Sequence, residues 1–220
     1  MTDELEYLRR QCPYFDEAYL AYLSSFRMRP NEQVKLSFTP TREGSLEGDL
    51  HIAIKGLWVE TIVYEIPLLA LTSEAYFKFC NKDWDHDGQE EKASKKCLTL
   101  LEHGCFVSEF GSRRRRDYKT HDLVVKGLCE ASKKASEAGW KGKLTGTSNV
   151  HFAMKYGIPP VGTVAHEWYM GIAAINDNYE NVNEMALRYW LGTFGEGVRS
   201  TSICMAGSTD SVIGPGHRTH

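Results

Sequence analysis

The sequence predicts an α/β protein in which a small antiparallel sheet precedes a series of parallel βα units. Two observations predict this class. The first 64 residues contain segments rich in β-branched and aromatic residues, which favour strands. After residue 64, helical patterns alternate with short apolar runs, and this alternation is typical of a parallel sheet. With 220 residues, 42% of them hydrophobic, the chain is long and apolar enough to bury a core.

The first part of the chain is expected to begin with two short helices and to continue as a sheet. Apolar and aromatic residues recur at helical spacing between residues 5 and 26. Strands are expected at Val34–Phe38, Leu50–Lys55 and Trp58–Tyr64, and Gly56 lies between the last two as a turn. The polar residues between the first two strands form the expected loop.

The second part is expected to alternate helices with short strands. Pro67 suits the first turn of a helix, and a polar linker follows that helix at residues 81–89. The expected helices are residues 68–79, 90–102, 121–138, 149–156 and 168–175. The expected strands are residues 105–109, 144–147 and 161–165.

The end of the chain differs from the rest. Apolar periodicity disappears after residue 195, and Gly, Ser and Thr accumulate. We therefore divide the chain into three parts, which are residues 1–64 with the small antiparallel sheet, residues 65–195 with the βα units, and residues 196–220, an irregular tail foreign to the fold.

The charge and cysteine content exclude several classes of protein. The chain has 26 Lys and Arg against 29 Asp and Glu, so its net charge of −3 provides no general attraction for nucleic acid or a membrane surface. The six cysteines form no Cys-x-x-Cys pair, and the polar start resembles no signal peptide. No apolar run reaches the roughly 18 residues that a bilayer requires. We expect a soluble cytoplasmic protein with reduced thiols, and leave a nuclear location open.

Three stretches that follow the expected parallel strands suit an anionic ligand. In parallel α/β proteins, ligands bind where strands end and helices begin. The arginines of Phe110–Arg116 can bind carboxylate or phosphate as rigid forks. Gly146–Asn149 is small and polar, so that Ser148 and Asn149 can approach a phosphate closely. Gly162–Trp168 contains His166, a possible nucleophile or acid near neutral pH.

Each stretch also has a purely structural interpretation. A run of four arginines is often a solvated turn or a nucleic-acid patch. Ser148 and Asn149 are typical helix caps. A single histidine such as His166 is more often structural than catalytic, although Glu167 beside it could orient it. A P-loop, a Gly-x-Gly-x-x-Gly fingerprint and a Gly-x-Ser-x-Gly elbow are all lacking, and no metal-ligand pattern is present.

Two of these stretches resemble the nicotinate phosphoribosyltransferase family, and especially its fungal form. They are Glu109–Arg116 and Gly162–Trp168. The resemblance continues, in order and spacing, through Tyr64–Leu69, Ser73–Phe77, Gly146–Asn149 and Thr193–Gly195. It implies an irregular, TIM-like α/β barrel of the type II phosphoribosyltransferase kind, preceded by a small α/β sandwich domain.

The resemblance implies an activity and assigns residues to it. The family transfers a phosphoribosyl group from phosphoribosyl pyrophosphate to nicotinate and couples this step to ATP hydrolysis, with Mg²⁺ expected on the pyrophosphate. By resemblance, His166 is the transiently phosphorylated histidine, and Thr163, Phe110 and Arg113 contact nicotinate. Arg113 and Arg114 face substrate carboxylate and phosphates. The complete enzyme is expected to be a homodimer with small-molecule substrates.

The sequence departs from the family at both ends. The family's opening segment is expected before Met1, and its later barrel strands and Gly-rich phosphate loop are expected after Gly195. We therefore interpret the chain as an N-terminal and central fragment of the enzyme. The alternative is a non-catalytic subunit that acts by pairing with a complete one, because a partial barrel leaves strand edges exposed.

Overall fold

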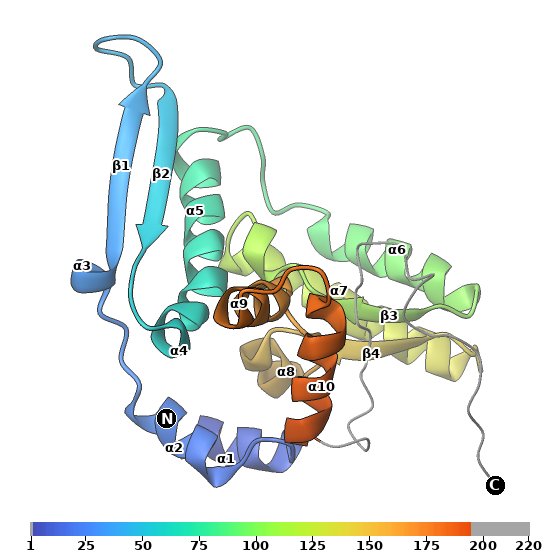
Figure 1. The fold of residues 1–220 in the computed structure, drawn as a ribbon. Coiled ribbons are helices and arrows are strands. Elements are labelled where there is room, and N and C mark those ends of the chain that lie inside the picture. Colours follow the sequence, from blue (N-terminus) through green and yellow to red (C-terminus); the bar gives the residue numbers. More distant parts are fainter. Residues whose placement is uncertain (1, 195–220) are drawn as a thin grey trace, which may run out of the picture.

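The computed structural model describes residues 2–194 of the chain (Figure 1). The expected tail at residues 196–220 lies outside the described residues. The described part is mixed α/β, with a two-stranded antiparallel sheet near its beginning and a two-stranded parallel sheet in its second half. The predicted fold class is therefore confirmed.

The first part contains the two expected helices and a β-hairpin. Asp16 caps the second helix, because its carboxylate accepts the N–H of Tyr19 at 2.7 Å. Strand β1 pairs with β2 from Val34 opposite Ile54 to Pro40 opposite Gly48, and the hairpin extends away from the helices at the upper left of Figure 1. The elements are α1 Thr2–Gln11, α2 Glu17–Ser25, α3 Pro30–Gln33, β1 Val34–Pro40 and β2 Gly48–Ile54.

The third strand predicted in this part, Trp58–Tyr64, is wrong. Residues Trp58–Thr61 form helix α4, and Ile62–Tyr64 form the short 3-10 helix η1. The run is rich in β-branched and aromatic residues, and so short an apolar run does not distinguish a strand from a buried helix. The helical form turns Tyr64 into the interior, where its hydroxyl donates to the Gln33 side chain at 2.8 Å.

The second part alternates helices with strands as expected, and its strands are parallel. Strand β3 pairs with β4, and the register shifts by one residue between Val107 and Ser108. The elements are α5 Glu65–Phe79, α6 Gln89–Glu102, β3 Phe106–Glu109, η2 Ser112–Arg114, α7 Tyr118–Glu137, β4 Lys143–Thr147, α8 Val150–Tyr156, α9 His166–Asn176 and α10 Val182–Phe194. The sequence reasoning missed α10, and the other five α-helices of this part begin and end within three residues of their expected limits.

The strand predicted at residues 161–165 is also wrong. Only a single parallel bridge, between Thr147 and Pro160, joins this segment to β4. The bridge is held by the N–H of Thr147, which donates to Pro159 at 3.1 Å, and by the N–H of Val161, which donates to Thr147 at 2.9 Å. Proline has no N–H to donate, so the two consecutive prolines limit the pairing to one bridge. Residues 159–161 nevertheless lie beside β4 in the position of a third strand, and we call them the third row.

The core of the second part lies between α6, α7 and the parallel sheet. Cys97 and Leu101 of α6 pack against Ala131 and Ala135 of α7, and Val107 of β3 covers them from the sheet. Small residues on α7 allow the two helices to approach closely. No helix within residues 2–194 combines the length and the apolar character that a bilayer crossing needs.

Candidate active site

The three stretches singled out in the sequence meet at one edge of the parallel sheet. Strand β3 ends at Glu109, β4 ends at Thr147, and the third row ends at Val161. The N–H of Ser148 donates to the carbonyl of Glu109 at 2.8 Å, which holds the second stretch against the first. Since parallel strands end at the same edge, residues 110–116, 148–149 and 162–166 all leave the sheet on that side.

A buried ion pair lies beneath this edge. Glu109 is 8% exposed and His121 is 3% exposed, and a carboxylate oxygen of Glu109 lies 3.0 Å from Nε2 of His121. The other oxygen of the same carboxylate accepts the hydroxyl of Thr147 at 2.5 Å, and the N–H of Gly111 also donates to Glu109. One carboxylate therefore connects β3, β4, α7 and the start of residues 110–116, which we call the arginine loop.

The pKa of the Glu109 carboxyl is lowered from its ordinary value. Burial by itself raises this pKa, because a buried charge loses its hydration, but the partners outweigh burial. Hydrogen bonds from His121 and Thr147, the positive charge of His121 and the N–H of Gly111 all favour the ionised form. Glu109 is therefore a structural carboxylate in this edge, not a proton donor at neutral pH.

The arginines of the loop point to different partners. Arg113 donates to the carboxylate of Glu65, at the start of α5, over 2.6 Å. Arg115 lies 3.8 Å from the carboxylate of Glu74. The guanidinium of Arg116 lies 5.4 Å from the ring centres of Phe77 and Trp84. The run is therefore only partly a solvated turn.

Ser148 and Asn149 connect the second stretch to the first. Asn149 caps α8, because its side-chain oxygen accepts the N–H of Phe152 at 3.1 Å. Its amide nitrogen donates to the hydroxyl of Ser112 at 3.0 Å. The predicted cap is confirmed, and it also holds the loop at residues 112–114 in place.

The remaining predicted site residues are exposed. Phe110 is 46% exposed, and both Thr163 and His166 are exposed. Within residues 2–194 the side chains of Thr163 and His166 make no hydrogen bond or ion pair. Ala165 is the N-cap of α9, so His166 is the first residue of this helix. The structure brings the stretches to one edge without a direct contact between His166 and Phe110 or Arg113.

Sequence reasoning missed the residue that holds the His166 helix. The indole N–H of Trp58, in α4, donates to the carboxylate of Glu167 at 2.8 Å, and the two residues are 109 positions apart. Its ring also stacks on Trp168, with ring centres 6.2 Å apart. Glu167 therefore binds Trp58, and the possibility that it orients His166 is not realised. The only sequence signal was a tryptophan in a segment predicted as a strand.

Gly171 of α9 allows this contact. A methyl group at this position would lie 2.2 Å from the Trp58 ring. We expect Gly171→Ala to lower the free energy of unfolding by about 1–3 kcal/mol, because the indole must move away from Glu167. Thermal and urea unfolding of the variant measure this.

Gly192 of α10 provides the matched control for that prediction. Apart from the backbone of its own helix, no atom of residues 2–194 lies within 4 Å of a methyl group added there. Gly192→Ala is expected to be neutral or to stabilise by about 0.5–1 kcal/mol, because alanine favours a helix. Equal effects of the two substitutions would contradict the role given to Trp58.

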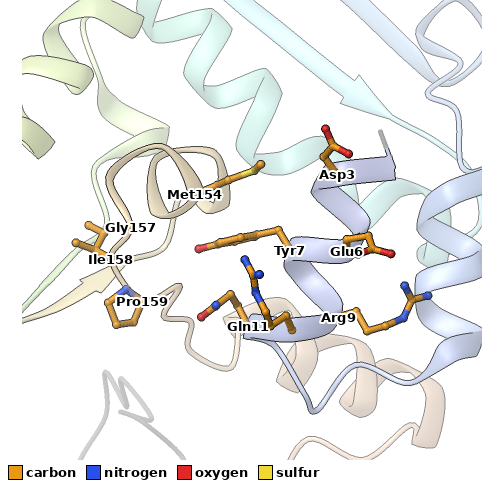
Figure 2. A pocket seen from close by; sticks show the side chains of 10 residues that line it. Asp3, Glu6, Tyr7, Arg9, Gln11, Met154, Gly157, Ile158 and Pro159 are labelled. Carbon is orange, nitrogen blue, oxygen red and sulfur yellow. The ribbon is translucent and has the colours of Figure 1, made fainter.

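Another cavity of the described residues lies away from this sheet edge. Figure 2 shows it between α1 and the end of α8, with Tyr7 pointing across it towards Met154. Its volume is about 860 Å³, and acidic and basic residues of α1 line one side. None of the predicted site residues borders it. Of the residues that do, Gly157 and Ile158 precede the third row and Pro159 begins it. This cavity is therefore not the candidate active site.

Comparison with known proteins identifies relatives along most of the chain. The N-terminal domain model of the nicotinate phosphoribosyltransferase (NAPRTase) family matches residues 1–73, and the NAPRTase family model matches residues 105–208. The second match thus ends inside the range that we expected to be a foreign tail. A probable nicotinate phosphoribosyltransferase of Schizosaccharomyces pombe is 46% identical over 195 residues, which cover 89% of this chain and 46% of the relative.

Solved structures show the same relationship. The crystal structure of a putative nicotinate phosphoribosyltransferase from Saccharomyces cerevisiae superimposes with a TM-score of 0.83 and 44% identity, over 89% of this chain and 47% of the other. The enzyme from Porphyromonas gingivalis gives a TM-score of 0.75 and 34% identity, over 88% and 46%. The chain spans about half the length of these relatives.

The fold and the site at the edge of the parallel sheet together define the class of protein. The described residues form part of a type II phosphoribosyltransferase fold. The chain belongs to the nicotinate phosphoribosyltransferase family.

Proposed function

We propose that the protein carrying this chain is an ATP-dependent nicotinate phosphoribosyltransferase. It forms nicotinate mononucleotide and pyrophosphate from nicotinate and phosphoribosyl pyrophosphate, the first step of NAD salvage from nicotinate. The printed names of its relatives in Schizosaccharomyces pombe and Saccharomyces cerevisiae support this. The observation that carries the proposal is the single sheet edge at which the arginine loop, the Ser148–Asn149 cap and the His166 segment all end.

Nicotinate binding is assigned to three exposed residues. The ring of Phe110 is half exposed and offers a face on which the pyridine ring can stack. Thr163 is exposed and its hydroxyl can donate to the substrate carboxylate. Arg113 can bind that carboxylate although it already contacts Glu65, because a guanidinium has five N–H donors.

Phosphate binding is assigned to Arg114, Ser148 and Asn149. Arg114 is exposed, and within residues 2–194 its guanidinium has no acidic partner. The Ser148 hydroxyl likewise makes no hydrogen bond within these residues, whereas its N–H is bonded to Glu109. Asn149 is engaged with Ser112 and Phe152, so it acts by holding the loop that carries the arginines.

His166 is assigned the coupling to ATP. An imidazole nitrogen attacks the γ-phosphorus of ATP, a P–N bond forms, and the P–O bond to the departing ADP breaks. The phosphoryl group then lies at the N-terminus of α9, where the unpaired N–H groups of the first turn favour an anion. Water later attacks the phosphorus, which releases phosphate and restores the histidine.

Mg²⁺ supplies positive charge to the departing pyrophosphate in this proposal. Within residues 2–194, no three His, Cys, Asp or Glu side chains come together to hold a metal ion. The expected ligands of the metal are therefore the phosphate oxygens of the substrate, and the arginines complete the neutralisation of the leaving group.

Replacing His166 tests the proposal. We expect His166→Ala to abolish incorporation of the γ-phosphate of labelled ATP, and to reduce formation of nicotinate mononucleotide with ATP to the rate without ATP. His103→Ala is the control, because His103 is an exposed histidine at the far end of α6. ATP stimulation and labelling that persist in His166→Ala would overturn the role of this residue.

A second candidate function is association with a complete subunit. Apolar side chains on the β-hairpin are exposed, including Leu36, Phe38 and Leu50, and such patches mark interaction surfaces. We expect the chain to co-elute with a full-length relative in size-exclusion chromatography, and Leu36→Ser with Phe38→Ser to weaken this. A chain that remains monomeric in the mixture would remove this candidate. Size-exclusion chromatography of the complete enzyme alone tests the homodimer that we expect for it.

A further inference from the structure

A second, smaller hollow lies on the outer side of the arginine loop. Its volume is about 400 Å³, and its walls come from α6, from α7 and from residues 109–116. We call it the α6–α7 cavity. The residues predicted to contact nicotinate do not border it, and neither does His166. A volume of this size suits a small ligand.

Basic side chains reach this cavity from two elements. Lys92 and Lys96 are four residues apart on α6 and so lie on one face of the helix. Arg114, Arg115 and Arg116 reach it from the loop. The cavity therefore has the composition of an anion site, with two ammonium groups on one wall and the arginine loop on another.

The positive charge of the cavity is poorly compensated by acidic groups. Within residues 2–194, Lys92, Lys96 and Arg114 make no ion pair. Arg115 reaches Glu74 only at 3.8 Å, and Arg116 stacks on aromatic rings instead of pairing with a carboxylate. The acidic residue in the wall is Glu109, and its carboxylate is already engaged by His121, by the hydroxyl of Thr147 and by the N–H of Gly111. An excess of cations that face one hollow favours an anionic occupant.

Buried polar atoms at the cavity lack partners. The hydroxyl of Thr120 and Nε of Arg115 are both buried, and neither makes a hydrogen bond within residues 2–194. Thr120 is 8% exposed and borders the cavity from the first turn of α7. Buried polar groups without a partner are costly and rare in folded proteins. A ligand that accepts hydrogen bonds would satisfy both atoms.

We propose that the α6–α7 cavity binds an anion with at least two linked phosphates. Two phosphate groups can engage the lysines of α6 and the arginines of the loop at once, and a phosphate oxygen can accept from Thr120. The occupant connects α6, α7 and the loop, and thereby orders the residues that precede and follow Arg113. The cavity shares Arg114 with the phosphate binding assigned above. Lys92, Lys96 and Thr120 belong to the cavity alone, so variants of these residues test the inference separately from the proposed function.

Binding of inorganic pyrophosphate to the full 220-residue chain tests the proposal. We expect saturable binding in isothermal titration calorimetry, and a Kd that rises about tenfold or more in the double variant Lys92→Gln, Lys96→Gln, because charge-assisted hydrogen bonds are strong. The matched control is Lys133→Gln, Lys134→Gln. These exposed lysines of α7 do not border the cavity, and their loss changes the net charge equally.

A Thr120→Val variant separates binding from folding. Valine keeps the shape of the side chain and removes the unpartnered hydroxyl, so we expect unchanged or higher thermal stability together with weaker pyrophosphate binding. His166→Ala is expected to bind pyrophosphate as the unsubstituted chain does. If His166→Ala lost pyrophosphate binding and Thr120→Val kept it, pyrophosphate would bind at the candidate active site and not in the α6–α7 cavity. That result would overturn the inference.

Lysine labelling provides a measurement on the unsubstituted chain. Pyrophosphate is expected to protect Lys92 and Lys96 from acetylation and to leave Lys133 and Lys134 reactive, as determined by mass spectrometry. Titration with phosphate, pyrophosphate and ADP identifies the source of the phosphates, since ADP binds as well as pyrophosphate only if the site accepts a nucleotide. Absence of protection, or equal losses in the two lysine double variants, would overturn the proposal.

Discussion

Replacement of Glu109 by alanine is expected to lower the free energy of unfolding by about 3–5 kcal/mol, because removing one partner of a buried ion pair leaves the other uncompensated. The substitution leaves the buried His121 without its acidic partner. It also removes the acceptor for the hydroxyl of Thr147 and for the N–H of Gly111. Urea unfolding followed by circular dichroism measures the loss.

Glu130→Ala is the control for this substitution. Glu130 is an exposed residue of α7, the helix that carries His121. An exposed substitution is expected to change stability by less than about 0.5 kcal/mol. A loss for Glu109→Ala no larger than that of Glu130→Ala would show that the buried pair contributes nothing to folding.

The pH dependence gives a second measure of the same pair. The pKa of Glu109 is lowered in the folded chain from an ordinary value of 4.5. A lowered carboxyl pKa stabilises the folded state fully above the unfolded value and loses this effect as the pH falls through the folded value. The stability difference between the unsubstituted chain and Glu109→Ala is therefore expected to shrink as the pH falls below 4.5 and through the lowered pKa of Glu109. Urea unfolding of both chains over a pH series measures this.

Gly146→Ala is expected to be the most damaging glycine substitution at the sheet edge. A methyl group there would lie 2.0 Å from the carbonyl oxygen of Pro159. The backbone φ at Gly146 is +146°, an angle that residues with a side chain rarely adopt. We expect a loss of about 3 kcal/mol or more, since overpacking against backbone adds to the cost of the strained conformation. Thermal unfolding measures the loss, and the separation of the third row from β4 is expected to expose Thr147 N–H to hydrogen exchange.

Gly162, which lies in the stretch predicted to bind nicotinate, provides the control. Apart from its two chain neighbours, no described residue has an atom within 4 Å of a methyl group at Gly162. Gly162→Ala is therefore expected to leave stability within about 0.5 kcal/mol of the unsubstituted chain. If the two alanine variants unfolded alike, the contact between β4 and residues 159–161 would not hold the edge together.

The parts of the candidate site that could be predicted are local in sequence. The arginine run, the Asn149 cap and the histidine at the start of α9 are each recognisable within a few residues, because their chemistry follows from residue type and from the strand or helix that adjoins them. The Glu109–His121 pair and the Trp58–Glu167 contact could not be found in this way. Each joins residues from different elements, and only the packing of those elements decides which polar groups are buried together.

The sequence by itself determined the class of the fold and most of its helices. Periodic apolar residues, the caps Asp16 and Asn149 and the alternation after residue 64 act within a single element, so their effect does not depend on what packs nearby. Only the tertiary structure decided that Trp58–Tyr64 is helical and that residues 161–165 form no strand. In both segments the residues suit a strand. A strand, however, requires a neighbour with free N–H and C=O groups in register, and residues 2–194 do not provide one for either segment.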